Sequence, residues 1–166
     1  MVSEGGRLTA AYSQPHRSYH GLAHVAFLLD EIDRRADLLG DREVVTLAAW
    51  RHDGVNDPRG KDDELRSAIW AGAALAAAGF APERIQAVEA MMLKTISHHA
   101  GEASVDEALF QDMDFAILGA PPETYAQYAD NIRAAYAFVP DEQFRTARRG
   151  FLRPVLAQRR MLRNVF

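Results

Sequence analysis

The chain contains no cysteine, and this single absence removes several kinds of chemistry. Without thiols there is no disulfide framework, no thiolate nucleophile and no thiolate metal site, so any metal must be held by nitrogen and oxygen donors. Positive charge is also scarce, because 19 Lys and Arg residues stand against 23 Asp and Glu residues and give a net charge of -4. This is the wrong sign for capture of a phosphate backbone, so nucleic acid polymers are disfavoured as partners.

A long apolar run is lacking as well. No stretch approaches the roughly 20 residues that a membrane-spanning helix needs, and the first 15 residues have no apolar core of the signal-peptide type. We therefore expect a cytoplasmic protein without membrane contact. With 166 residues, 48% of them hydrophobic, the chain can bury a sizeable core, and a single domain covering residues 1–166 is expected.

Helical periodicity is what the sequence does contain. Apolar residues such as Val25, Leu28 and Ile32 recur at spacings of three and four, with charged residues between them, and sustained strand-like alternation is missing. This predicts an all-α, single-domain bundle of six to seven helices with short connections. The expected helices cover residues 20–39, 42–53, 62–79, 82–99, 105–118, 123–138 and 141–162, the last of them kinked or broken at Pro154.

Six histidines all lie within the first 99 residues. His20 and His24 are four residues apart at the expected start of the first helix, so their imidazoles would share one face and could converge on one point. By itself this spacing is weak evidence, because a coincidental pair is easily found among six histidines.

His52 and Asp53 give a stronger signal, since they are adjacent at the end of an otherwise apolar helix. Burying an imidazole and a carboxylate costs desolvation free energy unless each group is paired or bound to a metal. A simple His–Asp hydrogen bond, or a favourable interaction with the end of the helix, remains an alternative explanation for the dipeptide.

Asp114 raises the same question in a third segment. Phe110, Ile117 and Leu118 place it on the apolar face of its expected helix, whereas the surroundings of Asp112 are less decisive. A buried carboxylate needs a proton or a cation, and a metal also held by histidines and by Asp53 would supply the cation. Pairing with one of the arginines of the C-terminal helices is the alternative.

Three segments in this order resemble a bacterial family of small predicted HD-domain phosphohydrolases, within the HD superfamily: residues 12–24 (YSQPHRSYHGLAH), 50–58 (WRHDGVNDP) and 112–119 (DMDFAILG). The resemblance continues through Tyr136, 139–141 and Phe144, so it covers nearly the whole chain, with the motifs in 12–119 and C-terminal helices in 122–163. It implies an HD-like helical fold and a metal-dependent phosphohydrolase that cleaves a small phosphomonoester or nucleotide.

Carried over residue by residue, the resemblance makes His24, His52, Asp53 and Asp114 the ligands of a divalent metal ion. Two imidazoles and two carboxylates suit Mn²⁺, Mg²⁺, Co²⁺, Ni²⁺, Fe²⁺ or Zn²⁺, and the sequence chooses neither among these ions nor between one ion and two. Such a metal would activate a water as the nucleophile and bind the phosphoryl oxygens.

Residues 19–24 also resemble the Tyr-His-Asn-x-x-His motif of cyclic nucleotide phosphodiesterases, which makes His20 the candidate general acid. Gly21 stands where that motif has asparagine, and Asn56 stands where many relatives have tyrosine or histidine, which weakens the case for a second metal. A glutamate that some HD nucleotidases place soon after His-Asp is missing at that spacing. Asp57 and Glu64 are the candidates for its role of orienting water, and capping or solvated charge is the alternative for both.

The candidates for binding phosphate are Arg17, Arg66 and His98, because guanidinium groups bind phosphate oxygens in pairs and the segment around His98 lies near the site in the family. Tyrosines at helical spacing, including Tyr128 and Tyr136, are interpreted mainly as core residues. The expected partner is a small phosphorylated molecule, and a homodimer is compatible with the sequence.

Two other functions stay open. An HD-fold diiron oxygenase would need further histidine ligands, for which His98 and His99 are candidates, although Asn56 argues against it. A catalytically inactive HD module that binds a metal or a nucleotide is the other, and the intact set of four potential ligands argues against it.

Overall fold

The computed structural model describes residues 3–97 and 104–157, and these form eight α-helices and two 3-10 helices without any strand. The predicted all-α class is confirmed, while the expected number of six to seven helices is wrong. The elements are α1 (Glu4–Tyr12), α2 (Leu22–Arg34), η1 (Ala36–Leu38), α3 (Arg42–Ala49), α4 (Asp63–Ala77), α5 (Pro82–Ser97), α6 (Val105–Asp114), η2 (Phe115–Gly119), α7 (Pro122–Ala135) and α8 (Asp141–Ala157).

The helix that periodicity missed is α1. It is short, and two glycines near its start weaken the helical pattern. Ser3 caps it by accepting a hydrogen bond from the Gly6 amide at 3.2 Å. Leu8 and Tyr12 are the residues that α1 buries, and they form a small apolar cluster with Val25 of α2.

Most of the helices are shorter than predicted, and two of these differences affect the candidate site. α2 begins only at Leu22, so His20 precedes the helix instead of sharing a face with His24. α3 ends at Ala49 and leads into turns. α8 continues past Pro154, so the predicted break is wrong. The proline deprives the Gly150 carbonyl of its helical donor, but both residues are exposed, so water can satisfy that carbonyl.

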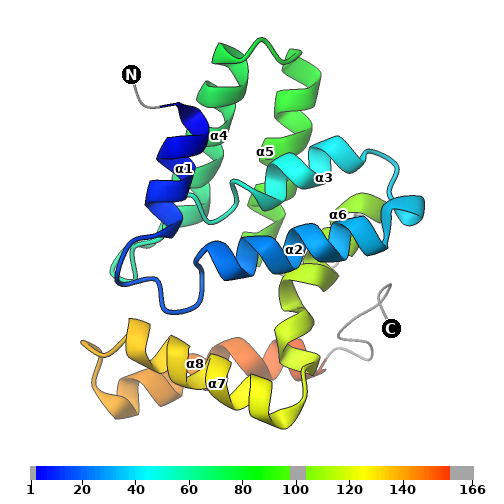
Figure 1. The fold of residues 1–166 in the computed structure, drawn as a ribbon. Helices are drawn as coiled ribbons and strands as arrows, with labels where there is room; N and C mark the ends of the chain where they lie inside the picture. Colours follow the sequence, from blue (N-terminus) through cyan, green and yellow to red (C-terminus); the bar gives the residue numbers. More distant parts are fainter. Residues whose placement is uncertain (1–2, 98–103, 158–166) are drawn as a thin grey trace.

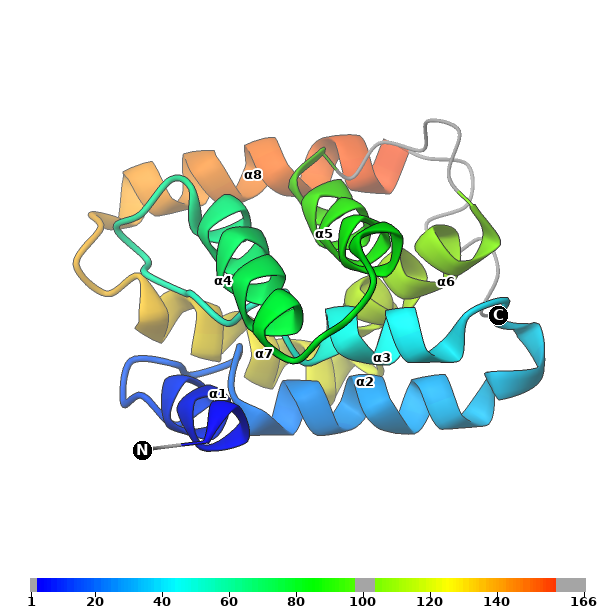
Figure 2. The same cartoon turned by 90° about the horizontal axis from the view of Figure 1, so that it is seen from above.

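The helices form an upper and a lower part. In Figure 1, α2 and α3 cross the middle of the molecule, with α1, α4 and α5 above them and α7 and α8 below. The view from above in Figure 2 shows that α7 and α8 run antiparallel. The lower part is therefore a helical hairpin lying beneath the remaining helices.

The hydrophobic core lies among α2 to α6. Its most buried side chains come from all five helices and include Leu28, Val45, Leu75, Met92 and Phe110. Among the described residues, no helix combines the length and the apolarity needed to cross a membrane.

The turn between α4 and α5 follows from its sequence. Gly79 has a φ of 83°, a left-handed conformation that favours glycine, and the Phe80 amide donates to the Leu75 carbonyl at 3.1 Å. Pro82 then begins α5, where a missing amide hydrogen costs nothing. This tight turn places α4 and α5 side by side (Figure 1).

Candidate metal centre and its cavity

Four side chains from three separate segments meet below the core. His24 lies in the first turn of α2, His52 and Asp53 lie in the turns after α3, and Asp114 is the last residue of α6. His24 Nε2 lies 3.3 Å from His52 Nε2 and 3.1 Å from Asp114 Oδ1, and His52 Nε2 lies 3.6 Å from Asp114 Oδ1. These three residues alone form a group that could hold a metal ion.

Asp53 borders the same point. Its Oδ2 lies 3.1 Å from His52 Nε2 and 3.8 Å from His24 Nε2. That oxygen is buried and has no hydrogen-bond partner among the described residues. A buried carboxylate oxygen without a donor is costly, so this atom calls for a cation or for a proton on the neighbouring His52.

The separations between donor atoms fit one metal ion. Ligand atoms that each lie about 2.0–2.2 Å from the same ion are roughly 3 to 3.5 Å apart. The five separations among the four side chains run from 3.1 to 3.8 Å. Two nitrogens and two carboxylates suit a borderline or hard divalent ion, so the donor chemistry fits as well.

A backbone contact directs the lone pair of His52 toward this point. Its Nδ1 lies 3.0 Å from the Ala49 carbonyl oxygen, and because a carbonyl only accepts, Nδ1 must carry the hydrogen. In the neutral ring Nε2 is then left without a hydrogen, which is the state that binds a metal. Gly54 follows Asp53, and a Cβ there would lie 3.1 Å from the Trp70 ring, so the turn is tightly packed.

Charge coupling in the cluster is strong. Burial alone would lower the pKa of His52, but Asp53 and Asp114 reverse this and raise it well above its usual value. Burial alone would raise the pKa of both carboxyl groups, yet the imidazoles hold both pKa values well below their usual range. A proton on His52 and a metal ion are therefore alternative ways to balance the two carboxylates.

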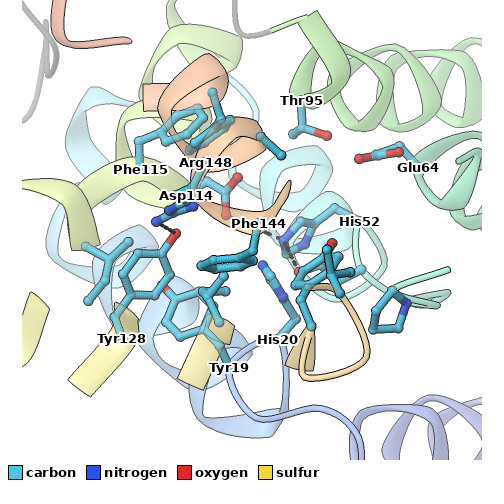
Figure 3. A pocket seen from close by; sticks show the side chains of 18 residues that line it. Tyr19, His20, His52, Glu64, Thr95, Asp114, Phe115, Tyr128, Phe144 and Arg148 are labelled. Atoms are coloured by element: carbon cyan, nitrogen blue, oxygen red, sulfur yellow. Dashed lines mark hydrogen bonds and ion pairs between the residues drawn. The ribbon is translucent and has the colours of Figure 1, made fainter. Parts of the chain in front are cut away.

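The cluster opens into a cavity of about 540 Å³. One side is formed by the ligand-bearing turns and by Glu64 and Thr95, and the other by the α7–α8 hairpin (Figure 3). Aromatic side chains contribute much of the lining: Tyr19, Phe115, Tyr128, Tyr136, Phe144 and Phe151. The space is large enough for a small organic molecule beside the cluster.

Of the predicted catalytic residues, His20 and Glu64 line this cavity and Asp57 does not. The His20 ring lies 5.9 Å from the His24 ring, and burial lowers the pKa of His20 below its usual value. Asp57 is exposed, and its Oδ1 accepts a hydrogen bond from the Arg59 amide at 3.0 Å, as in a turn.

The predicted phosphate-binding residues are not brought together. Arg66 is exposed and pairs with Asp63 at 3.5 Å, and His98 falls outside the described residues, as does His99. Arg17 donates to the carbonyl oxygens of Asp53 at 2.6 Å and of Gly54 at 2.9 Å. In this structure Arg17 therefore fixes the turn that carries Asp53 and does not line the cavity.

Sequence reasoning missed the lower wall of the cavity. Tyr128 and Tyr136 line it, although their spacing suggested core packing, and Arg148, which was not among the candidate residues, lines it as well. The available signal was weak: Arg148 lies four residues after Phe144 and three before Phe151, so it shares their helix face.

Comparisons with descriptions of known protein families, with curated proteins and with solved structures find no match to this chain. The features of this chain that bear on a function are therefore the cluster and its cavity.

Proposed function

We propose that this protein is a metal-dependent phosphohydrolase of the HD superfamily that cleaves a small phosphomonoester or nucleotide. The observation that carries the proposal is the convergence of His24, His52, Asp53 and Asp114 at one end of a cavity, with the buried Asp53 Oδ2 lacking a hydrogen-bond donor. The order and spacing of the motifs support the same assignment.

The four side chains would hold one divalent ion. A metal of this kind supplies the Lewis acidity that makes water a nucleophile near neutral pH and offsets charge on the phosphoryl group. Arg17 contributes indirectly, because its bonds to the Asp53 and Gly54 carbonyls keep the ligand-bearing turn in place.

To His20 we assign the donation of a proton to the leaving oxygen. This residue lines the cavity beside the cluster, and burial lowers the pKa of its ring in the free protein. The negative charge of a bound phosphate ester would favour the protonated form of His20, which is the form that a general acid needs. Glu64 lines the same cavity and is the candidate residue for orienting water.

The first test measures the metal content of protein purified without chelator, by elemental analysis. Phosphate release is then measured on a panel of nucleotides and sugar phosphates with Mn²⁺, Mg²⁺, Co²⁺ or Ni²⁺. We expect about one divalent ion per chain and release of phosphate. Two irons without phosphate release would contradict the proposal in favour of an oxygenase, and neither metal nor turnover would leave a binding module.

Asp53→Ala supplies the matched variant, because it removes one proposed ligand from a turn and should leave the helices intact. We expect it to lose stoichiometric metal, while Asp130→Ala, at an exposed position of α7, keeps it. Full retention of metal in Asp53→Ala would contradict the ligand assignment.

The role of His20 has its own test. His20→Ala should retain the metal but slow hydrolysis of esters with poor leaving groups about 10²-fold or more, and nitrophenyl phosphate much less. Equal slowing of both substrates would exclude His20 as the general acid.

A further inference from the structure

The α7–α8 hairpin presents one strongly basic side chain to the cavity. Arg148 of α8 lines it, and no other arginine or lysine does so among the described residues. In Figure 3 its guanidinium group lies at the hydroxyl group of Tyr128, on the side of the view away from Glu64. This position differs from that of its neighbour Arg149, which is exposed.

Aromatic contacts hold the Arg148 guanidinium in place. It lies 5.1 Å from the ring centre of Tyr128 and 5.1 Å from that of Phe151, and Nη2 donates a hydrogen bond to Tyr128 Oη at 2.8 Å. A guanidinium has five N–H donors, and within the described part of the chain this is the single hydrogen bond that it makes. The group is therefore positioned and still able to bind an anion.

The charges around the cavity indicate that Arg148 helps to attract an anionic ligand. A divalent ion at the cluster is neutralised by the carboxylates of Asp53 and Asp114, so the metal and its ligands do not by themselves attract a dianion over long range. Glu64 adds negative charge on the far side of the cavity from Arg148 (Figure 3). Arg148 therefore adds an attraction for an anionic ligand that the cluster does not supply, and this attraction acts near its own wall.

The rest of this wall suits a flat apolar group. Phe144 and Phe151 from α8 and Tyr128 from α7 line the cavity around Arg148, and Tyr19 packs edge to face against Tyr128 with ring centres 4.5 Å apart. Aromatic rings in this arrangement bind another ring by stacking and by burial of apolar area.

We propose that Arg148 and the aromatic residues around it form the substrate-binding wall, and that the ligand is a phosphate-type anion carried on an aromatic group. The inference rests on the proposed function, which places the reacting phosphoryl group at the metal cluster. Arg148 binds oxygens of the anion, and the rings of α7 and α8 bind the aromatic group.

Calorimetric titration with two phosphonates tests this, because phenylphosphonate and methylphosphonate share one anion and differ in the ring. Neither is hydrolysed at its carbon–phosphorus bond by activated water, so binding is measured alone. We expect the manganese-loaded protein to bind phenylphosphonate at least about tenfold more tightly than methylphosphonate. Equal affinities would overturn the aromatic part of the proposal.

Variants separate the charge from the rings. Arg148→Gln should weaken both ligands about tenfold or more, Arg148→Lys should recover part of this loss, and Arg149→Gln should bind as the unmodified protein does. Phe144→Leu should weaken phenylphosphonate alone. Arg148→Gln that binds both ligands like Arg149→Gln would overturn the proposal, provided that circular dichroism shows the same helix content in each variant.

Metal analysis of the same samples distinguishes this inference from the proposed function. Arg148→Gln should keep its metal, because Arg148 is not one of the four candidate ligands and its guanidinium group bonds to Tyr128 and stacks on Tyr128 and Phe151. Protein without metal in any form contradicts the proposed function. If the protein holds a metal but Arg148→Gln leaves the affinity for both phosphonates unchanged, only the present inference is contradicted. The inference is also overturned if neither the metal-loaded nor the chelator-treated protein binds a phosphonate.

Discussion

The two parts of the molecule differ in how they use their side chains. Helices α2 to α6 bury a continuous core of aliphatic residues, methionines and Phe110, whereas the described parts of α7 and α8 bury only Tyr128, Ile132 and Val155. All four candidate metal ligands belong to segments anchored in that core, and the aromatic wall of the cavity belongs mainly to the hairpin. A densely packed region suits ligands whose spacing must be fixed, and a half-buried helical wall suits contact with a small molecule.

The largest expected effect is the loss of metal affinity when a ligand from the core part is changed. Asp114→Asn should weaken binding of Mn²⁺ more than about hundredfold, because a neutral amide replaces a charged ligand. Asp112→Asn, two residues earlier on α6, should keep the metal, since Asp112 does not belong to the donor group. Metal affinity is measured by calorimetry on chelator-treated protein, and loss of metal in Asp112→Asn alone would move the assignment.

Removing a side chain should lower the free energy of unfolding more in the core than in the α7–α8 hairpin. Leu28→Ala, at a fully buried position of α2, is expected to lower the free energy of unfolding by about 2–5 kcal/mol. Leu156→Ala makes the same chemical change on α8, where the side chain is 67% exposed, and should change it by less than about 0.5 kcal/mol. Urea denaturation monitors both, and similar losses would contradict the placement of the core.

Acid should weaken metal binding in a predictable way. Because the pKa of His52 is raised in the metal-free cluster, this imidazole is protonated below that pKa and must lose its proton to bind a metal. Below the raised pKa, the affinity for Mn²⁺ should fall about tenfold for each pH unit, and above it the dependence should flatten. Calorimetry in a series of buffers measures this slope, and a flat profile from pH 5 to pH 8 would argue against His52 as a ligand.

The smallest expected effect concerns a contact between the two parts. Arg59, in the loop after the metal-binding turn, stacks on Phe138 in the α7–α8 connection, with 4.7 Å between guanidinium and ring centre. Arg59→Met should lower stability by about 0.5–1 kcal/mol, because both residues are largely exposed. Thermal denaturation compares this variant with Arg145→Met, in which an exposed arginine of α8 is changed in the same way. Equal melting temperatures would show that the contact between Arg59 and Phe138 does not stabilise the protein.

Much of the helical structure could be predicted from periodicity. Each of the seven expected helices has a counterpart, and the errors concern ends and one short element. α1 was missed because its amphipathic pattern is short and glycine-rich, and the break at Pro154 was wrong because an exposed carbonyl can be hydrated. Helix ends were less predictable since they depend on caps and tertiary contacts, as at Leu22, where extended Gly21 precedes α2.

The candidate site, too, could be predicted from the sequence only in part. His52 and Asp53 could be identified as unusual from the sequence because a buried polar pair needs a partner whatever the fold. The position of Arg17 could not, because its acceptors at Asp53 and Gly54 lie 36 and 37 residues along the chain. Arg148 was missed for a related reason: one helix face does not reveal which cavity it borders.

The sequence by itself determined that this protein is helical, that it lacks thiol chemistry, and which imidazoles and carboxylates require a partner, because periodicity, composition and desolvation are local properties. Only the tertiary structure decided that His24, His52, Asp53 and Asp114 meet at one point and that Arg148 lines the aromatic cavity beside them. The distances within the cluster arise from the packing of α2, α3 and α6 against one another, and the place of Arg148 arises from how the α7–α8 hairpin lies beneath them. Both depend on contacts between residues far apart in the chain.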